Sequence, residues 1–205
     1  MEYKMKCLLT GGSGLLGRHL KIEGDKPSHK ELDITKKIEP KEYDLIVNMA
    51  AFTDVEGAET RKKECFDVNV LGVMNLLEAY PTTPFVQISS EYAKNPVNFY
   101  ALTKHLAEKL VEAHSNYLII RTLFKPKPWK YPKAFKDFIT QGDYVDKIAP
   151  IIDNEIKNWD RKTNKLIYVG TGRKTLLSLA QQTKPDVIPN SVKDIKGVVI
   201  PTDYE

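Results

Sequence analysis

The stretch Thr10-Gly11-Gly12-Ser13-Gly14-Leu15-Leu16-Gly17 decides the fold, because it is a loop almost without side chains between two apolar segments. The segment before it, residues 4–9, has the composition of a short β-strand, and the leucines after it have the spacing of a helix. Its glycines match G-x-G-x-x-G, starting at Gly12, and also T-G-x-x-G-x-x-G, starting at Thr10. Backbone N–H groups at the start of a helix bind phosphate, and glycines allow a close approach that a Cβ would block. We therefore expect a dinucleotide's pyrophosphate at this first βα turn.

The composition is that of an ordinary folded protein. The 205 residues carry a net charge of +4, with 41% hydrophobic and 28% charged side chains, so a nucleic-acid partner is not expected. No apolar run approaches the roughly 18 residues that a membrane span needs, and Met1-Glu2-Tyr3-Lys4 does not lead into a signal-peptide core. We expect a cytoplasmic protein without a membrane partner. Cys7 and Cys65 lack metal-site spacing and are predicted to be buried thiols, so no metal site is expected.

Residues 1–122 alternate between strand and helix patterns. After Gly17 a helix is expected to run to Ile22, and a reduced or irregular edge strand is expected in 24–32. The further expected elements are a buried strand at 43–48, a helix at 59–80 interrupted or tightly packed near Gly72, a strand at 85–90, a helix at 100–115 and a strand at 117–121. This order predicts an α/β protein with a Rossmann-type, doubly wound parallel sheet over residues 1–122.

Residues 123–205 are predicted to form a small substrate-binding annex, partly packed on the sheet. Three prolines within Lys125–Lys133 indicate a loop there. The elements expected after it are a helix containing residues 134–139, a helix at 145–159 with Asp146 as N-cap, a buried strand at 166–169, a helix around 176–180 and an extended tail.

A tyrosine and a lysine stand four residues apart in Tyr100-Ala101-Leu102-Thr103-Lys104, hence on one face of the predicted helix. A nearby ammonium favours the phenolate, so such a tyrosine can exchange a proton with a substrate carbonyl or hydroxyl. The pair alone is common by chance, and a surface pair is the plain alternative. Here it follows a strand that ends in Ser89-Ser90, where a hydroxyl can hydrogen-bond the same substrate oxygen. The combination favours catalysis.

In this order, the motifs resemble those of the extended short-chain dehydrogenase/reductase superfamily, and more closely its dTDP-4-dehydrorhamnose reductase branch. The resemblance covers most of the chain. Besides the glycine loop, it rests on the stretches Glu31–Thr35, Val47–Thr53 followed by Glu59, Asn69–Gly72, Ile88–Tyr92, Tyr100–Lys104, Tyr144–Asp146 and Tyr168–Gly172.

The resemblance implies the site residues. Tyr100 would donate a proton to a keto sugar linked to a nucleotide, Lys104 would lower the pKa of Tyr100 and bind the nicotinamide ribose, and Ser90 would orient the carbonyl. The implied cofactor-binding residues are Gly11, Ser13, Gly14, Leu15, Leu16, Gly17, Asp33, Ile34, Ala50, Ala51, Tyr100 and Lys104. The same resemblance suggests a homodimer through the helices at 59–80 and 100–115. Asn69 and Gly72 are left out of the site, because an asparagine that ties strands together and a glycine at a helix contact are sufficient explanations for these two residues.

Two hypotheses follow from the resemblance. The first is an NAD(P)-dependent reductase acting on a nucleotide-linked keto sugar. The second is a non-catalytic, NADP-binding regulatory subunit, because the regulatory subunit of methionine adenosyltransferase resembles the same branch. The shortened first crossover, the short segment between Glu91 and Tyr100 and the small annex favour the second. The intact Ser90, Tyr100 and Lys104 favour the enzyme, which we adopt.

Two basic segments bear on ligand choice. Ser28, His29 and Lys30 stand where an acid would bind a ribose 2′-hydroxyl, which favours NADP(H) over NAD(H), and Arg18 could add charge. The lysines of the Lys125–Lys133 loop are expected to meet a sugar nucleotide's pyrophosphate. The alternative is a solvated loop whose Trp129 merely covers the core, with the substrate nearer 170–173.

Overall fold

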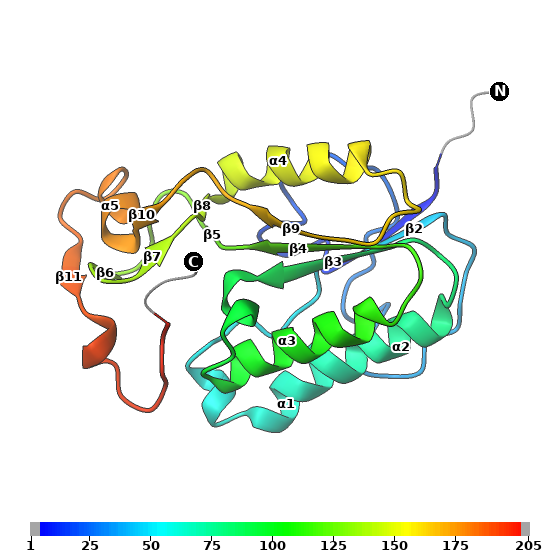
Figure 1. The fold of residues 1–205 in the computed structure, drawn as a ribbon, viewed down its shortest axis with the longest axis horizontal. Helices are drawn as coiled ribbons and strands as arrows, with labels where there is room; N and C mark the ends of the chain where they lie inside the picture. Colours follow the sequence, from blue (N-terminus) through cyan, green and yellow to red (C-terminus); the bar gives the residue numbers. More distant parts are fainter. Residues whose placement is uncertain (1–4, 202–205) are drawn as a thin grey trace.

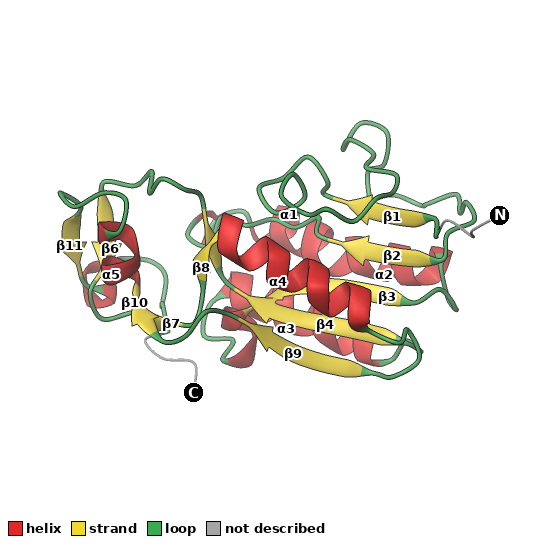
Figure 2. Ribbon diagram, turned by 90° about the horizontal axis from the view of Figure 1, so that it is seen from above, coloured by secondary structure: helices red, strands yellow, loops and turns green. Residues whose placement is uncertain are grey.

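The structure, a computed structural model, describes residues 5–201, so the segment Met1–Lys4 considered above lies outside the described residues. A five-stranded sheet forms its centre, with the strand order β1-β2-β3-β4-β9 and parallel pairing throughout (Figures 1 and 2). Its strands are β1 (Cys7–Thr10), β2 (Leu45–Asn48), β3 (Phe85–Ser90), β4 (Tyr117–Thr122) and β9 (Lys165–Val169). Every residue of β1, β2 and β3 is buried, as their continuous apolar runs predict.

Helices cover both faces of this sheet (Figure 1). One face carries α1 (Lys62–Phe66), a π-helical segment (Asp67–Leu71), α2 (Gly72–Ala79) and α3 (Phe99–Glu112), and the other carries α4 (Val145–Asn158). The predicted doubly wound Rossmann-type fold is confirmed. The predicted irregularity near Gly72 is also confirmed, since a Cβ at Gly72 would lie 2.7 Å from the side chain of Ile34.

The first crossover differs from the prediction. No regular helix follows the glycine loop: residues 11–19 form successive turns, so the helix expected to reach Ile22 is wrong. Four glycines within the loop disfavour a helix, which explains the difference. The reduced edge strand is confirmed as a single bridge, in which Leu9 N–H donates to Asp25 O and Asp25 N–H donates to Cys7 O, both at 2.8 Å.

The annex lies beyond the carboxyl ends of the strands (Figure 2). It contains β5 (Phe124–Lys125), β6 (Lys133–Phe135), β7 (Ile139–Thr140), β8 (Asp143–Tyr144), β10 (Lys174–Thr175), α5 (Leu176–Gln181) and β11 (Ile188–Asn190). The helix predicted over 134–139 is wrong, because β6 pairs with β11 and β7 pairs with β10, and these pairings with later segments override the local pattern. Single-turn helices are formed by Gly57–Glu59, Glu91–Lys94 and Val192–Asp194.

Two details of the α4–β9 unit correct the sequence analysis. Tyr144, not Asp146, is the N-cap residue of α4, and Asp146 lies in the first turn with its carboxylate 2.8 Å from Lys127 Nζ. β9 is an edge strand and not a buried one, since Leu166 and Tyr168 are 36% and 41% exposed. Only one of its faces packs against the core, through Ile167 and Val169.

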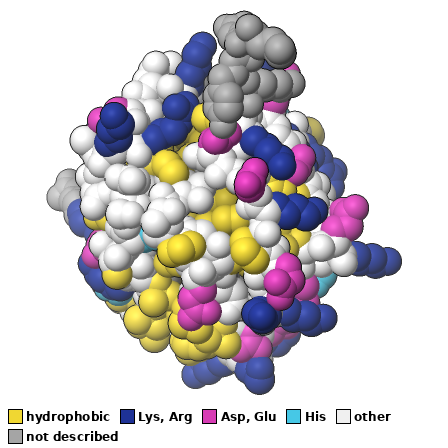
Figure 3. All heavy atoms as spheres, turned by 90° about the vertical axis from the view of Figure 1, so that its right-hand side faces the viewer, with side chains coloured by type: hydrophobic (Ala, Val, Ile, Leu, Met, Phe, Trp, Pro, Cys, Tyr) yellow, Lys and Arg dark blue, Asp and Glu magenta, His cyan; other side chains and the backbone are white. Residues whose placement is uncertain are grey.

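The surface agrees with the balanced composition. On the face shown in Figure 3, basic and acidic side chains are interspersed and do not form a patch of one sign. None of the helices within residues 5–201 combines the length and the apolar character needed to cross a membrane. Both Cys7 and Cys65 are buried free thiols, as predicted. The described residues also contain no group of three or more His, Cys, Asp or Glu side chains arranged to hold a metal ion.

Candidate functional site

A cavity of about 690 Å³ lies at the carboxyl ends of β1 and β2. After β1 the chain crosses to the Asp25 bridge, which lies along one edge of β1. It then returns to form β2 along the opposite edge of β1, so the direction in which the chain winds reverses here. In an open α/β sheet this reversal of direction creates a crevice in which ligands bind. The cavity extends along the sheet to Ile88 of β3 and to Phe124 after β4, so it can take an elongated ligand.

Most of the predicted cofactor-binding residues line this cavity. They are Gly11, Ser13, Gly14, Leu15, Leu16, Gly17, Ile34, Ala50 and Ala51. Asp33 does not line it; its carboxylate accepts hydrogen bonds from the Thr35 backbone and hydroxyl instead. Lining residues that the sequence analysis missed include Phe52, Asp54 and Arg61. Phe52 and Asp54 follow closely after Ala51 at the carboxyl end of β2, so their position in the sequence is enough to predict them as lining residues. Arg61 is the N-cap residue of α1, and no sequence pattern marks it as a lining residue.

The three glycines of the T-G-x-x-G-x-x-G pattern have different tasks. Gly11 has a φ of +68°, and a Cβ there would lie 2.6 Å from the Ala50 nitrogen. A Cβ at Gly17 would lie 2.6 Å from the Gly12 Cα. The fold itself therefore requires both glycines. Gly14 is exposed to the cavity, and its Cβ would meet only the Gly11 carbonyl oxygen, at 3.0 Å. Gly14 is thus the position at which a side chain would take ligand space.

A buried chain of side-chain hydrogen bonds fixes the strand ends beneath the cavity. The Thr10 hydroxyl donates to Asn48 Oδ1 at 2.5 Å, and Asn48 Nδ2 donates to Gln87 Oε1 at 2.9 Å. These three residues belong to β1, β2 and β3, and all three are buried. Because every link is satisfied, the network holds the floor of the cavity in one geometry.

Ser90 and Tyr100 come together at the carboxyl end of β3. The phenol of Tyr100, in the first turn of α3, is hydrogen-bonded to the Ser90 hydroxyl. Burial raises the pKa of Tyr100 to about 12, and the hydrogen bond from Ser90 opposes this shift only in part. The direction is opposite to our expectation that Lys104 lowers this pKa. Tyr100 therefore keeps its proton at neutral pH, which is the form that can donate one.

Lys104 lies one helical turn beyond Tyr100 and is buried, with 3% of its surface exposed. Its Nζ donates to the Ile88 carbonyl oxygen at 2.9 Å, and Ile88 lines the cavity. Burial lowers the pKa of Lys104 to about 8, with Glu108 and Cys65 acting in the other direction. None of Ser90, Tyr100 and Lys104 lines the cavity itself. Lys104 is bonded to Ile88 of its wall, and Tyr100 is bonded to Ser90, two residues further along β3.

The Lys125–Lys133 loop contributes only part of its residues to the cavity. Lys125, Pro126 and Tyr131 line it. Lys127 is held outside by Asp146, and Lys130 is exposed. Trp129 is 5% exposed and packs with the annex core and the Tyr131 ring, at a centroid distance of 5.3 Å. This is the covering role considered for Trp129 above.

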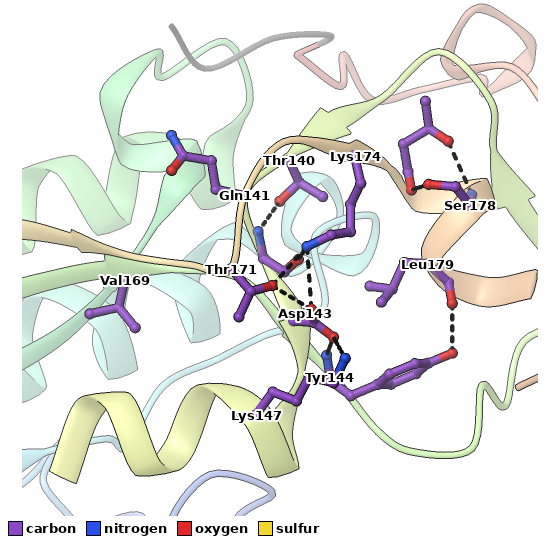
Figure 4. Close-up of polar contacts among 12 residues, drawn as sticks. Thr140, Gln141, Asp143, Tyr144, Lys147, Val169, Thr171, Lys174, Ser178 and Leu179 are labelled. Atoms are coloured by element: carbon purple, nitrogen blue, oxygen red, sulfur yellow. Dashed lines mark hydrogen bonds and ion pairs between the residues drawn. The ribbon is translucent and has the colours of Figure 1, made fainter. Parts of the chain in front are cut away.

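A second polar cluster joins the annex to the sheet (Figure 4). The buried Asp143 carboxylate accepts from the Thr171 hydroxyl and lies 3.3 Å from Lys174 Nζ. Burial alone would raise the pKa of Asp143, but the hydrogen bonds from Thr171, the Tyr144 amide and Lys174 outweigh it and lower this pKa. Thr171 thus serves the junction, and residues 170–173 do not line the cavity.

The same junction reaches the segment that follows Ser90. The Glu91 carboxylate accepts from the Thr140 hydroxyl at 2.5 Å and from the Gln141 amide at 3.1 Å. Burial raises the pKa of Glu91, against the effect of these bonds. The annex is therefore tied to the end of β3, where Ser90 stands.

Comparisons with known proteins agree with this geometry. The family model described as the RmlD substrate binding domain matches residues 5–143. A dTDP-4-dehydrorhamnose reductase of Aggregatibacter actinomycetemcomitans is 34% identical over 103 residues, which cover 42% of this chain and 35% of the relative. One of Mycolicibacterium smegmatis is 27% identical over 146 residues, which cover 57% of this chain and 45% of the relative. The matches span less than half the length of these two relatives.

Among solved structures, the dTDP-4-dehydrorhamnose reductase from Bacillus anthracis in complex with NADP aligns with a TM-score of 0.83. The alignment covers 100% of this chain and 90% of that chain at 21% sequence identity. At this identity the likeness shows a shared fold. The resemblance found in the sequence motifs is confirmed by the family match.

Proposed function

Because the chain belongs to the family of the RmlD substrate binding domain, we propose that it is an NADP(H)-dependent reductase of a nucleotide-linked keto sugar. The observation that carries the proposal is the pairing of Ser90 with a protonated Tyr100 behind the wall of a dinucleotide-sized cavity. A proton donor next to such a cavity is the arrangement that carbonyl reduction needs.

The glycine loop fits a dinucleotide. Gly14 faces the cavity where a Cβ would occupy space, and Gly11 to Gly17 line one end of it. These residues would hold the pyrophosphate, with Ile34 toward the adenine and Ala50 and Ala51 along the crevice. When bound, the cofactor would supply the hydride. Away from the glycine loop the cavity is lined by Ile88 and Phe124, and Ile88 is the residue to which Lys104 is bonded.

The chain's own residues would then handle the proton. Ser90 would orient the substrate carbonyl through its hydroxyl, and Tyr100 would donate its phenolic proton to the carbonyl oxygen. The Lys104 ammonium would stabilise the phenolate that forms, across the short distance that one helical turn imposes. Burial of all three residues strengthens these interactions because water is excluded around them.

We assign the preference for NADP(H) over NAD(H) to the region around His29. His29 lines the cavity, and the next residue, Lys30, is exposed. Arg18 is also exposed, and its Nε donates to the carbonyl oxygen of Ser13 in the glycine loop at 2.5 Å. Basic groups near a ribose favour a 2′-phosphate. Titration of protein fluorescence with NADPH and NADH tests the preference. Equal affinity, or tighter binding of NADH, would overturn it.

Turnover tests the proposal as a whole. NADPH oxidation should be measured with a panel of 4-keto and other keto sugar nucleotides, with Tyr100→Phe as the inactive control. One competing function is a regulatory subunit that binds NADP(H) without turnover, which the short segment between Glu91 and Tyr100 favours. NADPH binding with no oxidation of any panel member would support that function and contradict the reductase.

A homodimer through the α1–α2 and α3 face remains our proposal for assembly. Met74 and Leu102 expose apolar surface on these helices, at 36% and 38%. Sedimentation analysis of the wild type and of Leu102→Glu checks this. A monomeric wild type would contradict it.

A further inference from the structure

Lys125 occupies an unusual position for a cation. It stands in β5, directly after the end of β4, and it is partly buried where it lines the cavity. Its Nζ lies 5.5 Å from the centroid of the Tyr131 ring. Within residues 5–201 no carboxylate pairs with it, and burial alone shifts its pKa, downward. Keeping an ammonium there is unfavourable unless the functional state supplies an anion.

The other charged groups of the cavity wall are already paired with one another. Arg61 binds Asp54 at 2.7 Å and Glu64 at 3.3 Å, and its guanidinium lies over the Phe52 ring. The remaining lysines of the loop are elsewhere, with Lys127 on Asp146 and with Lys130 and Lys133 exposed. Lys125 is therefore the lysine of this loop that is placed to meet a ligand in the cavity.

The position of Lys125 indicates which anion it meets. β4 is the third strand from β1 in the sheet order, and strand spacing places their ends about 14 Å apart. A lysine side chain cannot bridge that distance to a pyrophosphate held at the glycine loop. A second ligand that enters beside Tyr100 and Ile88, however, would bring its own phosphates to the β4 side.

We propose that Lys125, backed by the Tyr131 ring, binds the diphosphate of the nucleotide portion of the substrate and thereby selects diphosphate-linked substrates. The inference rests on the proposed function, since it deepens the substrate class of that site. An ammonium binds phosphate as a compact point charge. The Tyr131 ring already restricts the conformations of the Lys125 side chain, so less entropy is lost when the ligand binds. The diphosphate would also neutralise the partly buried charge.

Direct binding of UDP and dTDP tests the inference without requiring turnover. Isothermal titration with each nucleotide should be carried out with and without saturating NADPH. Lys125→Gln should raise the dissociation constant of the preferred nucleotide at least tenfold and flatten its salt dependence. Lys125→Arg should retain most of the affinity. Lys130→Gln, an exposed lysine of the same loop, is the matched control and should bind as the wild type does.

Several outcomes would overturn the inference. One is equal nucleotide affinity in Lys125→Gln and wild type. Another is a loss of NADPH affinity in Lys125→Gln without loss of nucleotide affinity, because Lys125 would then serve the cofactor. Failure of wild type to bind either nucleotide would also contradict it. Failure of wild type to bind NADPH would instead contradict the proposed function, and the titration without NADPH would still report on Lys125.

Discussion

The ammonium nitrogen of Lys104 lies 2.9 Å from the carbonyl oxygen of Ile88, so the lysine of the Tyr-x-x-x-Lys pair is anchored to β3 from its place on α3. Because Ile88 lines the cavity, this bond places the cation against the wall behind which Tyr100 stands. The position explains why burial dominates the titration of Lys104.

The pH dependence of reduction follows from this burial. With a pKa of about 8 in the folded protein, the Lys104 ammonium is lost as pH rises above that value. We expect kcat/KM for reduction to decline above about pH 8, because Tyr100 loses the cation that stabilises its phenolate. The pH–rate profile measures this. Lys104→Met should have a low kcat/KM that does not decline further above pH 8. Lys109 is an exposed lysine on the same helix, and Lys109→Met should show the same decline as the wild type.

Stability should change in the opposite direction over the same range. The folded-state pKa of Lys104 is depressed below its usual value of 10.5, so the charged form costs folding free energy. This cost is present in full below about pH 8 and is relieved as pH rises to 10.5. The wild type should therefore gain stability relative to Lys104→Met between these values. Urea unfolding at several pH values would show it, and a constant difference would contradict the assignment.

Replacement of Tyr100 and Lys104, the proposed catalytic pair, should separate turnover from binding. Tyr100→Phe removes the proton donor and should lower kcat by about 100-fold or more, with NADPH affinity nearly unchanged. Lys104→Ala should impair both, because its ammonium would also meet the nicotinamide ribose. Tyr80→Phe, at the end of α2, is the control. Retention of most of the wild-type rate by Tyr100→Phe, on a substrate that the wild type reduces, would remove the phenol from the mechanism.

The glycine loop offers a contrast between ligand and fold. Gly14→Val should fold, because only the Gly11 carbonyl oxygen opposes a Cβ there, but its branched side chain should abolish NADPH binding. Gly17→Ala should instead destabilise the protein, since its Cβ would lie 2.6 Å from the Gly12 Cα. Fluorescence titration and thermal unfolding measure the two effects. Unchanged NADPH affinity in a folded Gly14→Val protein would place the phosphate site elsewhere.

The sequence predicted the sheet well because its signals are local. The apolar runs of β2 and β3 show burial on both faces. The glycine loop lies at the end of β1 as predicted, but the helix expected after it does not form. The candidate proton-transfer residues also follow from spacing, since one helical turn separates Tyr100 from Lys104.

The errors arise where distant segments decide the structure. The pattern around Ala134 and Phe138 suits a helix, but pairing with β11 and β10 makes two strands. The apolar run of β9 suggests a central strand, yet no strand lies beyond it within the described residues. The direction of the Tyr100 pKa shift depends on burial, which residue spacing does not reveal.

The junction of annex and sheet should depend on the buried Asp143 carboxylate. Asp143→Asn would remove the buried charge that Lys174 pairs with and leave Lys174 only the Gly142 carbonyl and the Thr171 hydroxyl, at a cost of about 3 kcal/mol. The control is Asp146→Asn, which breaks the exposed pair with Lys127 and should cost less than about 1 kcal/mol. Urea unfolding measures both, and equal costs would contradict the role assigned to Asp143.

The stability contribution of Asp143 should also depend on acid. Its folded-state pKa lies below its usual value of 3.8, so its stabilisation is present above that pH and is lost as pH falls through the folded-state pKa. The difference between wild type and Asp143→Asn should therefore shrink below about pH 4. A difference that stays constant down to pH 3 would show that packing, and not charge, holds this junction.

Lys125 should cost the protein stability when no anion is bound. Burial lowers its pKa, so its stability cost is present near neutral pH and is relieved only as pH rises toward its usual value of 10.5. Lys125→Met removes the charge and keeps the apolar stem beside Tyr131, so Tm at pH 7 should rise by about 2–4 °C. Differential scanning calorimetry measures this, with Lys130→Met as the exposed control, whose Tm should stay within about 1 °C. The gain should disappear near pH 10.5, where the wild type loses the same charge. A lower Tm in Lys125→Met at pH 7 would mean that Lys125 stabilises the fold, and the charge would then need no ligand to explain it.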